Sequence, residues 1–317
     1  MTRLALLVAL VCLAVAGCAG APPPLALGVA ADSPGEVRRF ADRVGAPAGL
    51  YQWYAAWEGR PRFDRERAQR TTDLGAVPLL TWEPWTAGGG VDQPRYALAR
   101  VAAGDHDDYI ASYARQVRDW GGVLALRFAH ELNAPHYPWS VGVNGNSPDD
   151  ALAAWRHVRD VFAEQGTDVV WVWSVNVSAP GSADYAEFYP GDDDVDWVGL
   201  DGYNGGTALP WGGWQSPEEL LGDDLERLDD LSDRPLLLTE VGSTEAGGDK
   251  AAWIAELFDL AQERRLRAVV WFDYAKETDW RVASSPQSSE AFRRAVAAEG
   301  RVTATPPLPD RLTEGPD

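Results

Sequence analysis

Short apolar runs recur along the chain at intervals that suit the strands of a parallel sheet. Eight such runs, several of them nearly continuous in Val, Leu, Ile or Trp, are Leu25–Ala31, Gly49–Ala55, Ala76–Trp82, Val123–His130, Val169–Val175, Val195–Tyr203, Pro235–Val241 and Ala268–Tyr274. Continuous apolar runs are typical of parallel strands that are covered on both faces. The pattern therefore predicts eight buried strands.

Amphipathic segments lie between these runs and open on helix-start residues. In three of them Ser is followed by Pro, and apolar residues then recur at helical spacing: Ser33-Pro34, Ser147-Pro148 and Ser216-Pro217. Two further segments, 109–120 and 253–260, place aromatic and aliphatic residues on one helical face. Strands that alternate with helices are typical of the α/β class, and eight of them predict a single (β/α)8 TIM barrel.

A doubly wound parallel sheet is the alternative fold for the same alternation. Such sheets usually have fewer strands, and they often carry a phosphate-binding G-x-G-x-x-G turn after the first strand. That motif does not follow Leu25–Ala31, and no internal repeat is found. The barrel is therefore the favoured prediction, and it is assigned to residues 26–302.

The first residues of the chain have the composition of a bacterial lipoprotein signal. Arg3 precedes the apolar run Leu4–Val15, which is too short to span a bilayer and suits a secretory signal. The small residues Ala16 and Gly17 then stand directly before Cys18, as in a lipobox, where cleavage precedes the cysteine and its sulfur is acylated. We expect residues 1–17 to be the signal peptide. An ordinary signal peptide that is cleaved nearby is the alternative.

Proline-rich segments flank the predicted barrel. Residues 18–25 contain three consecutive prolines and are predicted to be a stiff tether between the lipidated Cys18 and the domain. Residues 303–317 contain four prolines and few side chains to bury, and they are predicted to be a flexible tail. Together these features predict a protein that is exported and anchored outside the cytoplasm, with the lipid as its only membrane contact.

The chain is strongly acidic, with 48 Asp and Glu against 28 Lys and Arg and a formal net charge of −20. Such a chain repels phosphate backbones, so nucleic acid is an unfavourable partner and a neutral substrate is favoured. Cys12 and Cys18 fall in the predicted signal and at the lipid site, which excludes structural disulfides and cysteine zinc sites. The four histidines show no metal-binding spacing. We expect a monomer without a metal or organic cofactor.

Polar and aromatic residues gather where the predicted strands end. They occupy the carboxyl ends of seven strands, at 51–54, 81–85, 127–133, 173–176, 201–204, 239–242 and 271–273. In a (β/α)8 barrel this end carries the active site. Aromatic faces can stack on the apolar faces of sugars, and amides and carboxylates can hydrogen-bond to hydroxyls. The sequence therefore predicts a site for a sugar polymer.

Two glutamates, Glu131 and Glu240, stand at the ends of predicted strands four and seven. Two carboxyl groups that flank a glycosidic bond can act as acid and nucleophile, and retention of configuration requires them roughly 5–5.5 Å apart. Strands four and seven face each other across an eight-stranded barrel, so the pair can meet over its mouth. We predict that Glu131, with a raised pKa, is the general acid/base and that Glu240 is the nucleophile. Solvated acids at strand ends are the alternative.

These residues resemble glycoside hydrolase family 26, and the resemblance covers about residues 25–295. Its most specific part is Leu126–Asn133 together with Tyr137-Pro138-Trp139. The segments Leu238–Gly242 and Gly199–Tyr203 resemble the family's nucleophile strand and sixth strand, and Asp279–Arg281 resembles the segment after strand eight. The resemblance implies retaining hydrolysis of a β-glycan. The family is best known for endo-β-1,4-mannanases, and it also contains β-1,3-1,4-glucanases, β-1,3-xylanases and exo-acting mannan enzymes.

The resemblance also implies that Tyr203 hydrogen-bonds the nucleophile and that Trp280 stacks on the substrate. We predict that His130 helps Tyr203 to hold Glu240 or binds a substrate hydroxyl; a core imidazole is the alternative. We predict that Arg127 orients one of the two glutamates, with a simple counter-charge as the alternative. The other expected substrate contacts are hydroxyl-reading side chains and stacking indoles: Asn133, Asn176, Asp201, Trp82, Trp139 and Trp271.

One position departs from the family pattern. Mannanases of the family commonly have Trp five residues after the acid/base, where this chain has His136, so His136 is expected to be either a sugar contact or a surface loop residue. The preferred function is hydrolysis of a neutral β-linked polysaccharide by an endo-β-1,4-mannanase-like enzyme. The alternatives are a β-1,3-1,4-glucanase, an exopolysaccharide hydrolase, and a surface lipoprotein that binds glycan without cleaving it.

Overall fold

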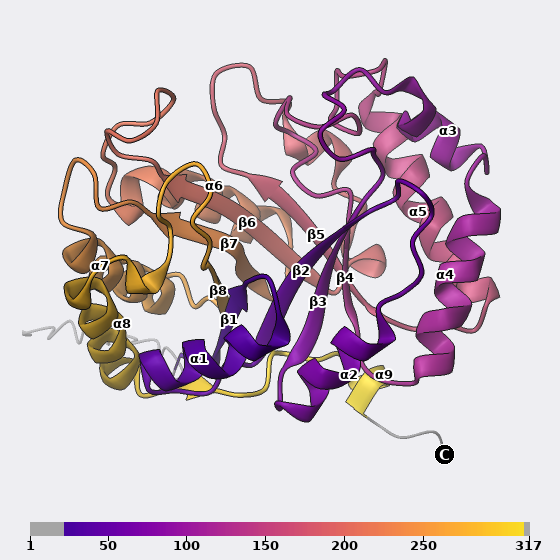
Figure 1. Ribbon diagram of the computed structural model, residues 1–317. Coiled ribbons are helices and arrows are strands. Elements are labelled where there is room, and N and C mark those ends of the chain that lie inside the picture. The colour runs from indigo at the N-terminus through magenta and orange to yellow at the C-terminus, as the bar shows by residue number, and fades with distance from the viewer. Residues whose placement is uncertain (1–21, 314–317) are drawn as a thin grey trace, which may run out of the picture.

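The described part of the chain, residues 22–313, closes into a barrel. A computed structural model places eight parallel strands side by side in chain order, with β1 hydrogen-bonded to both β2 and β8 (Figure 1). The strands are β1 Leu25–Ala30, β2 Leu50–Ala56, β3 Val77–Glu83, β4 Ala125–Phe128, β5 Val170–Asn176, β6 Trp197–Asn204, β7 Leu236–Ser243 and β8 Ala268–Phe272. The predicted single (β/α)8 barrel is confirmed. The predicted signal peptide 1–17 and Cys18 lie outside the described residues.

Helices alternate with the strands and surround the barrel (Figure 1). They are α1 Pro34–Val44, α2 Arg65–Asp73, α3 Leu98–Ala102, α4 Asp107–Trp120, α5 Pro148–Glu164, α6 Pro217–Leu231, α7 Lys250–Glu263, α8 Pro286–Glu299 and α9 Asp310–Thr313, with short 3-10 turns at Pro94–Tyr96, Tyr185–Phe188, Asp192–Asp194 and Val282–Ser284. Ser147 and Ser216 each form a capping box, in agreement with the predicted helix starts. No helix in the described range has the length and apolar character needed to cross a membrane.

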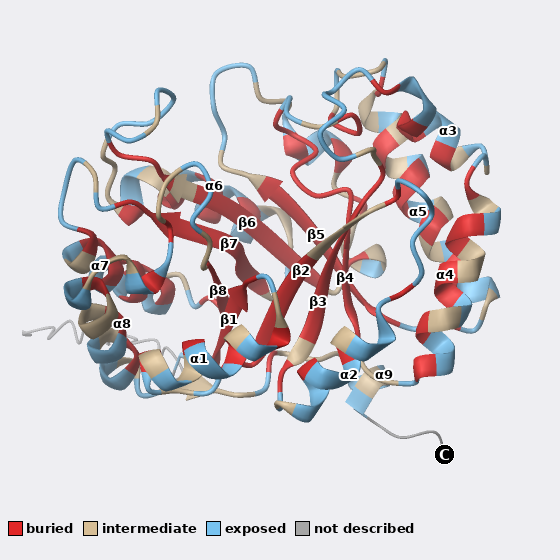
Figure 2. Ribbon diagram, in the orientation of Figure 1, coloured by how far each residue is buried: buried red, intermediate tan, exposed pale blue. Residues whose placement is uncertain are grey.

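Alternation along the strands separates two apolar cores, and most strand residues are buried (Figure 2). One core fills the barrel and includes Leu50 and Ala125, whereas the other lies between strands and helices and includes Leu126 and Trp82. Successive side chains of a strand point to opposite faces, so every second residue faces the barrel interior. Near the carboxyl ends of the strands these interior positions are polar, and they form the floor of the candidate site.

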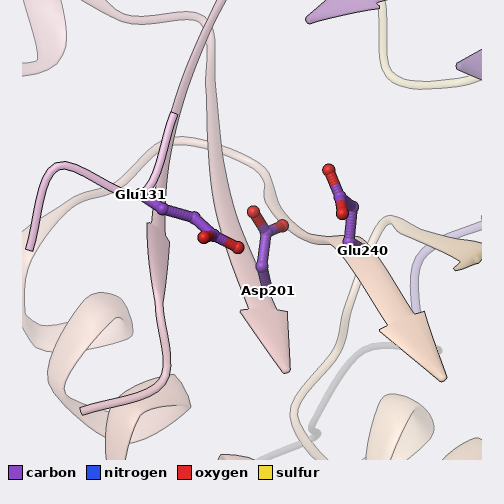
Figure 3. A group of neighbouring side chains, drawn as sticks. All are labelled: Glu131, Asp201 and Glu240. Carbon is purple, nitrogen blue, oxygen red and sulfur yellow. The ribbon is translucent and has the colours of Figure 1, made fainter. Parts of the chain in front are cut away.

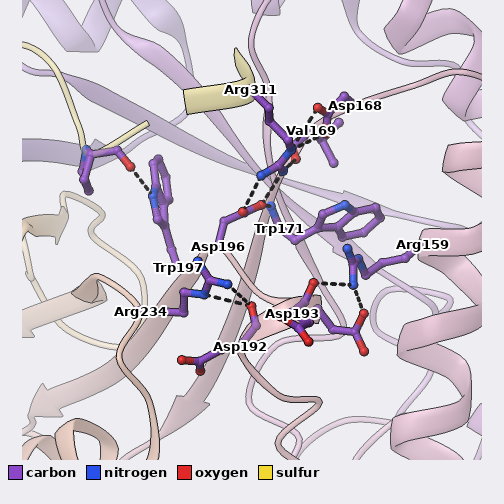
Figure 4. A network of polar contacts seen from close by, with 12 residues as sticks. Arg159, Asp168, Val169, Trp171, Asp192, Asp193, Asp196, Trp197, Arg234 and Arg311 are labelled. Carbon is purple, nitrogen blue, oxygen red and sulfur yellow. Dashed lines mark hydrogen bonds and ion pairs between the residues drawn. The ribbon is translucent and has the colours of Figure 1, made fainter. Parts of the chain in front are cut away.

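The segment after α8 is docked on the barrel over residues 303–313, which corrects the predicted flexible tail. We call residues 302–313 the strap. Its strand β9, Val302–Thr303, pairs with β1, and the Trp197 indole donates a 2.8 Å hydrogen bond to the carbonyl of Pro307. Arg311 of α9 donates to the carboxylates of Asp168 and Asp196 at 2.7–3.0 Å (Figure 4). These partners precede β5 and β6, so the strap crosses the amino end of the barrel.

Loss of the Arg311 side chain is expected to destabilise the fold measurably. The Arg311→Met change removes charge-assisted bonds, but the side chain is 41% exposed and solvent weakens its ion pairs, so we expect a loss of about 1 kcal/mol. That corresponds to roughly 2–4 °C in Tm, which thermal unfolding would detect. Arg70→Met is the control, since Arg70 pairs only with an exposed glutamate on its own helix. An equal shift for both variants would contradict a stabilising strap.

Candidate active site

Three carboxyl groups meet at the carboxyl ends of β4, β6 and β7 (Figure 3). Glu131 follows β4, Asp201 lies in β6 and Glu240 lies in β7, and one carboxylate oxygen of each lies within 4.8 Å of the other two. The residues are 5%, 0% and 4% exposed, respectively. The structure therefore brings the two predicted glutamates together and adds a buried aspartate between them.

The backbone around Glu131 adopts an uncommon conformation that belongs to the end of β4. Ala129 and Glu131 have φ angles of 46° and 54°, a region that residues with a Cβ seldom occupy and that costs about 1–3 kcal/mol per residue. Bonds to both neighbouring strands hold this turn. The amide of Ala129 donates to the carbonyl of Trp82 at 3.1 Å, and the amide of Glu131 donates to the carbonyl of Ser174 at 3.0 Å.

A β-bulge in β7 brings Glu240 beside Asp201. Leu200 of β6 pairs with Leu238 of β7, whereas the next residue, Asp201, pairs with Glu240, so Thr239 is the extra residue. The Thr239 hydroxyl donates to Asp201 Oδ1 at 2.5 Å. Thr239 and Glu240 are consecutive, yet both reach the same polar cluster, which a regular strand does not permit.

Arg127 lies at the centre of the cluster and is fully buried. Its Nε donates to Thr81 Oγ1 at 2.9 Å and its Nη1 donates to Asp201 Oδ2 at 2.6 Å, while its Nη2 donates to Glu240 Oε1. The guanidinium thus joins β3, β6 and β7 through one planar group. These bonds agree with the prediction that Arg127 orients a glutamate. At 0% exposure it cannot touch a substrate directly.

Two neutral donors complete the hydrogen bonds to Glu240. Gln52 of β2 donates from Nε2 to Oε1 at 2.9 Å, and the Tyr203 hydroxyl donates to Oε2. The Tyr203 contact is the one that the family resemblance implied. Together with Arg127, these bonds hold both oxygens of the carboxylate in a fixed direction.

His130 does not donate to Glu240 in the described structure, and that prediction is wrong. Its ring packs against Tyr137 and Trp139 with centroid distances of 4.7 and 5.5 Å, and its Nδ1 has no hydrogen-bond partner among the described residues. Burial lowers the pKa of His130 well below its usual range, and the charge of Arg127 acts in the same direction. The ring is therefore neutral, and its environment is that of a core imidazole.

Glu131 lies in surroundings that favour its protonated form. Burial raises the pKa of Glu131 well above its usual range, and the negative charges of Asp201 and Glu240 add to this effect. Burial also raises the pKa of Asp201 to about 7, although Arg127 opposes the shift. The side chain of Asn176 opposes the rise in the pKa of Glu131, but burial and the two neighbouring carboxylates outweigh it. A carboxyl group that keeps its proton near neutral pH can act as a general acid.

The same three carboxylates have the spacing of a possible cation site. Arg127, however, already donates to Asp201 and Glu240, and its guanidinium supplies positive charge inside the cluster. The donor set therefore fits acid–base chemistry between carboxyl groups better than a metal centre.

Two of the three residues expected to read sugar hydroxyls are engaged within the protein. The Asn133 side chain donates to the carbonyl of Asn176 at 2.7 Å and accepts from the amide of Asn176 at 2.9 Å. Asp201 is 0% exposed and is bonded to Arg127 and Thr239. Both predictions are wrong, because buried polar groups near crowded strand ends satisfy one another first. Asn176 is half-buried beside Glu131 and keeps the predicted position.

None of the four predicted stacking tryptophans presents an open ring face. Trp82 and Trp271 belong to the outer core between strands and helices, so their prediction is wrong. The Trp139 ring is covered by Tyr137 at a centroid distance of 4.4 Å. Trp280 is 2% exposed and packs against Tyr203 at 5.2 Å. Trp139 and Trp280 therefore support other rings at the site.

Half-buried aromatic side chains take the place of the predicted tryptophans. Tyr54, Trp85 and Tyr137 are partly accessible, and Trp85 meets Tyr137 edge-to-face at a centroid distance of 5.5 Å. His136 is exposed on the neighbouring turn, which agrees with the surface alternative for that residue.

Three polar residues of the cluster were not predicted as site residues: Gln52, Glu83 and Thr239. Gln52 follows the interior residue Leu50 by two positions, and Glu83 follows the interior residue Leu79 by four. The period-two pattern of the strands could therefore have indicated both. Thr239 could not be found in this way, because the bulge in β7 interrupts the alternation.

The amino-acid sequence is similar to those of known glycoside hydrolases. A family model described as glycosyl hydrolase family 26 matches residues 77–216. Endoglucanase H of Acetivibrio thermocellus is 33% identical over 269 residues, which are 83% of this chain and 29% of that protein. The β-1,3-xylanase TXYA of a Vibrio species is 32% identical over 108 residues, 32% of this chain and 22% of that protein. The chain thus spans less than a third of the length of these relatives.

Solved structures share the fold at lower sequence identity. A β-mannanase from Bacteroides ovatus superposes with a TM-score of 0.67 at 20% identity, covering 88% of this chain and 90% of that one. An endo-β-1,4-mannanase from Bacillus sp. JAMB-750 gives a TM-score of 0.67 at 16% identity and covers 87% and 86%. At these identities the likeness is one of fold.

Proposed function

The chain belongs to glycosyl hydrolase family 26, and from this premise we propose that it is a glycoside hydrolase that cleaves a neutral β-glucan internally with retention of configuration. The separation of its carboxyl groups carries the proposal. Oxygens of Glu131 and Glu240 lie within 4.8 Å of each other, close to the roughly 5–5.5 Å of retaining pairs and short of the 6.5–9.5 Å of inverting pairs.

In the proposed first step, Glu240 Oε attacks the anomeric carbon while Glu131 donates its proton to the glycosidic oxygen. The carbon–oxygen bond breaks, the leaving sugar departs with the proton, and a glycosyl ester forms on Glu240. In the second step, Glu131, now a carboxylate, takes a proton from water as the water oxygen attacks the same carbon, and the ester bond between that carbon and Glu240 breaks. The sugar leaves with retained configuration, and both glutamates return to their initial states.

The surrounding residues give each glutamate its proposed role. Arg127, Gln52 and Tyr203 donate to both oxygens of Glu240, and the positive guanidinium lies against its carboxylate. Glu131 has no cationic hydrogen-bond partner among the described residues, and its nearest charged neighbours are carboxylates. One carboxyl group is thereby prepared as the nucleophile and the other as the acid.

We give glucan precedence over mannan as the substrate. The relative named Endoglucanase H matches 83% of this chain at 33% identity, whereas the mannanase structures are similar mainly in fold. His136, at a position where mannanases of the family commonly have Trp, supports the same choice. Mannan is the second candidate, because an endo-mannanase-like enzyme is the preferred function from the sequence.

A panel of polysaccharides tests the proposal. Mixed-linkage β-glucan, carboxymethylcellulose, β-1,4-mannan and β-1,3-xylan are incubated with the protein, the products are sized, and the anomer released first is identified by proton NMR. We expect internal cleavage of a β-glucan and initial release of the β-anomer. Faster cleavage of mannan would overturn the substrate, and initial release of the α-anomer would overturn the mechanism.

Activity is expected to fall as the pH rises through the raised pKa of Glu131, because the general acid then loses its proton. Asp201→Asn removes a negative charge beside Glu131 and so lowers its pKa, which moves the alkaline limb of kcat/KM to lower pH. The measurement is a pH–rate profile of both proteins, with Asp119→Asn as the exposed control. An alkaline limb that does not move would contradict the pairing of Glu131 with Asp201.

We also propose that the protein is exported and held at the membrane by a lipid on Cys18. The proposal is supported by the apolar run before Cys18 and by the small residues that adjoin it. Labelling with a fatty-acid analogue in a bacterial host, with Cys18→Ser as the comparison, tests it. Equal labelling of both proteins would contradict the assignment of Cys18.

A further inference from the structure

Glu83 is an acidic side chain at the barrel mouth that the proposed mechanism does not use. It is the last residue of β3 and is 7% exposed. Thr81, two residues earlier, accepts a hydrogen bond from Arg127 inside the barrel. Because the strand alternates, Glu83 points to the same side as Thr81, toward the polar cluster.

Glu83 has no ion-pair partner in the part of the chain that the structure describes. The charged groups that face it are Glu240, Arg127 and Lys276, and Lys276 pairs instead with Glu277 at 3.1 Å. Burial raises the pKa of Glu83 to about 7; the neighbouring Trp85 side chain opposes the shift, and the charge of Glu240 adds to it. A carboxylate at this place therefore has no paired counter-charge among the described residues.

Two half-buried aromatic residues border Glu83. Trp85 is two residues further along, and its amide donates to the carbonyl of Glu83 at 2.9 Å. Tyr137 comes from the loop after β4 and meets Trp85 edge-to-face. Burial raises the pKa of Tyr137, and the charges of Glu131, Glu240 and Glu83 add to the shift. A carboxyl group beside partly open aromatic rings offers both kinds of contact that a sugar ring uses.

We propose that Glu83, Trp85 and Tyr137 form a sugar-binding subsite beside the cleavage point, in which the Glu83 carboxylate accepts hydrogen bonds from hydroxyls of one neutral sugar ring. This subsite deepens the proposed function and rests on it. The sugar must be uncharged, because Glu83, Asp201, Glu131 and Glu240 would repel an acidic one. The hydroxyl protons then add hydrogen-bond donors to a carboxylate that has no ion-pair partner among the described residues.

Without a bound sugar, the wild-type protein should therefore have a lower free energy of unfolding than a variant in which Glu83 carries no charge. The pKa of folded Glu83, about 7, lies above its ordinary value, so the unfolded chain releases this proton at lower pH. Stability is unaffected below the ordinary value and is lost as the pH rises toward 7. A residue kept for packing would show the opposite pattern, since its removal would lower stability at every pH.

The Glu83→Gln variant separates these cases. On the polymer that the wild type cleaves, we expect KM to rise about tenfold, as for the loss of one charge-assisted hydrogen bond, with a smaller change in kcat. In thermal unfolding we expect Tm to match the wild type at pH 4.5 and to exceed it at pH 8. Glu66→Gln, an exposed substitution on α2, is the matched control and should change neither quantity.

A binding measurement makes the result independent of turnover. Calorimetric titration with a hexasaccharide of mixed-linkage β-glucan compares Glu240→Gln with the Glu240→Gln/Glu83→Gln double variant. Weaker binding by the double variant supports the subsite even if the wild type cleaves no polysaccharide, in which case only the proposed hydrolysis fails.

Unchanged Kd and KM in an active enzyme overturn the subsite alone. A lower Tm at both pH values with unchanged binding assigns Glu83 to packing and overturns the proposal. Absence of binding in both overturns the subsite and the function together.

Discussion

Glu240→Gln is expected to lower kcat on polysaccharide by on the order of 10⁴–10⁶-fold, because the amide cannot form the glycosyl ester. Glu131→Gln is expected to lower it by about 10²–10⁴-fold, the usual contribution of a general acid. The two variants differ further on an aryl glycoside with a dinitrophenolate leaving group. That group needs no proton, so kcat/KM of Glu131→Gln should remain near the wild-type value, whereas Glu240→Gln should stay inactive.

The measurement is steady-state kinetics on both substrates, with circular dichroism as the check that each variant folds. Both replacements are isosteric, and both residues lie in a cluster that keeps its other hydrogen bonds, so folding should persist. A Glu131→Gln enzyme with full activity on the polymer would refute its role as the acid. A Glu131→Gln enzyme that loses kcat/KM equally on both substrates would show that it serves some purpose other than proton donation.

Arg127→Met is expected to destabilise the protein by about 3–5 kcal/mol, because it leaves the buried carboxylates of Asp201 and Glu240 without their counter-charge. At about 2–4 °C per kcal/mol, Tm should fall by roughly 10 °C. The loss should be larger at pH 8 than at pH 5, since protonation at lower pH neutralises Asp201, whose pKa is raised to about 7. Activity should fall with it, because Glu240 loses a bond that fixes its direction.

Arg127→Lys is the matched control for charge. It keeps a positive group but not the planar fork that reaches Thr81, Asp201 and Glu240 at once, so an intermediate loss is expected. Chemical unfolding at the two pH values measures both variants. A loss of the same size for Met at pH 5 and pH 8 would mean that Arg127 contributes through packing rather than through its ion pairs.

The strands could be predicted because a strand that is buried on both faces consists of a nearly continuous run of apolar residues. All eight predicted runs overlap β1 to β8, and the Ser-Pro starts of α1, α5 and α6 lie where the helices begin. Helix α2 has no apolar periodicity that could predict it, since only Ala68 and Thr71 of its residues are buried. The strap was missed for another reason. Its order comes from ion pairs between Arg311 and residues more than a hundred positions away, which local composition does not reveal.

The site was predictable in its chemistry and less so in its contacts. The motif around Glu131 and the strand that carries Glu240 indicated the pair, and the family resemblance indicated Tyr203. Position at a strand end does not by itself place the indoles of Trp82 and Trp271 in the site. Both residues lie on the outer face of their strands, toward the helices. Thr239 reaches Asp201 only through a bulge, and a bulge depends on the pairing of two strands rather than on either sequence alone.

Both ends of the described chain emerge from the face opposite the glutamates. Arg301 donates to the carbonyl of Pro23, which precedes β1, and Arg311 donates to the carbonyl of Val169, which precedes β5. An enzyme immobilised through either end, on a cell surface or on a synthetic bead, would therefore direct the carboxyl ends of its strands, where the glutamates lie, toward the surrounding medium. Insoluble fibres could then reach the reaction centre without the support obstructing them, and a fusion partner at either end would leave the approach clear.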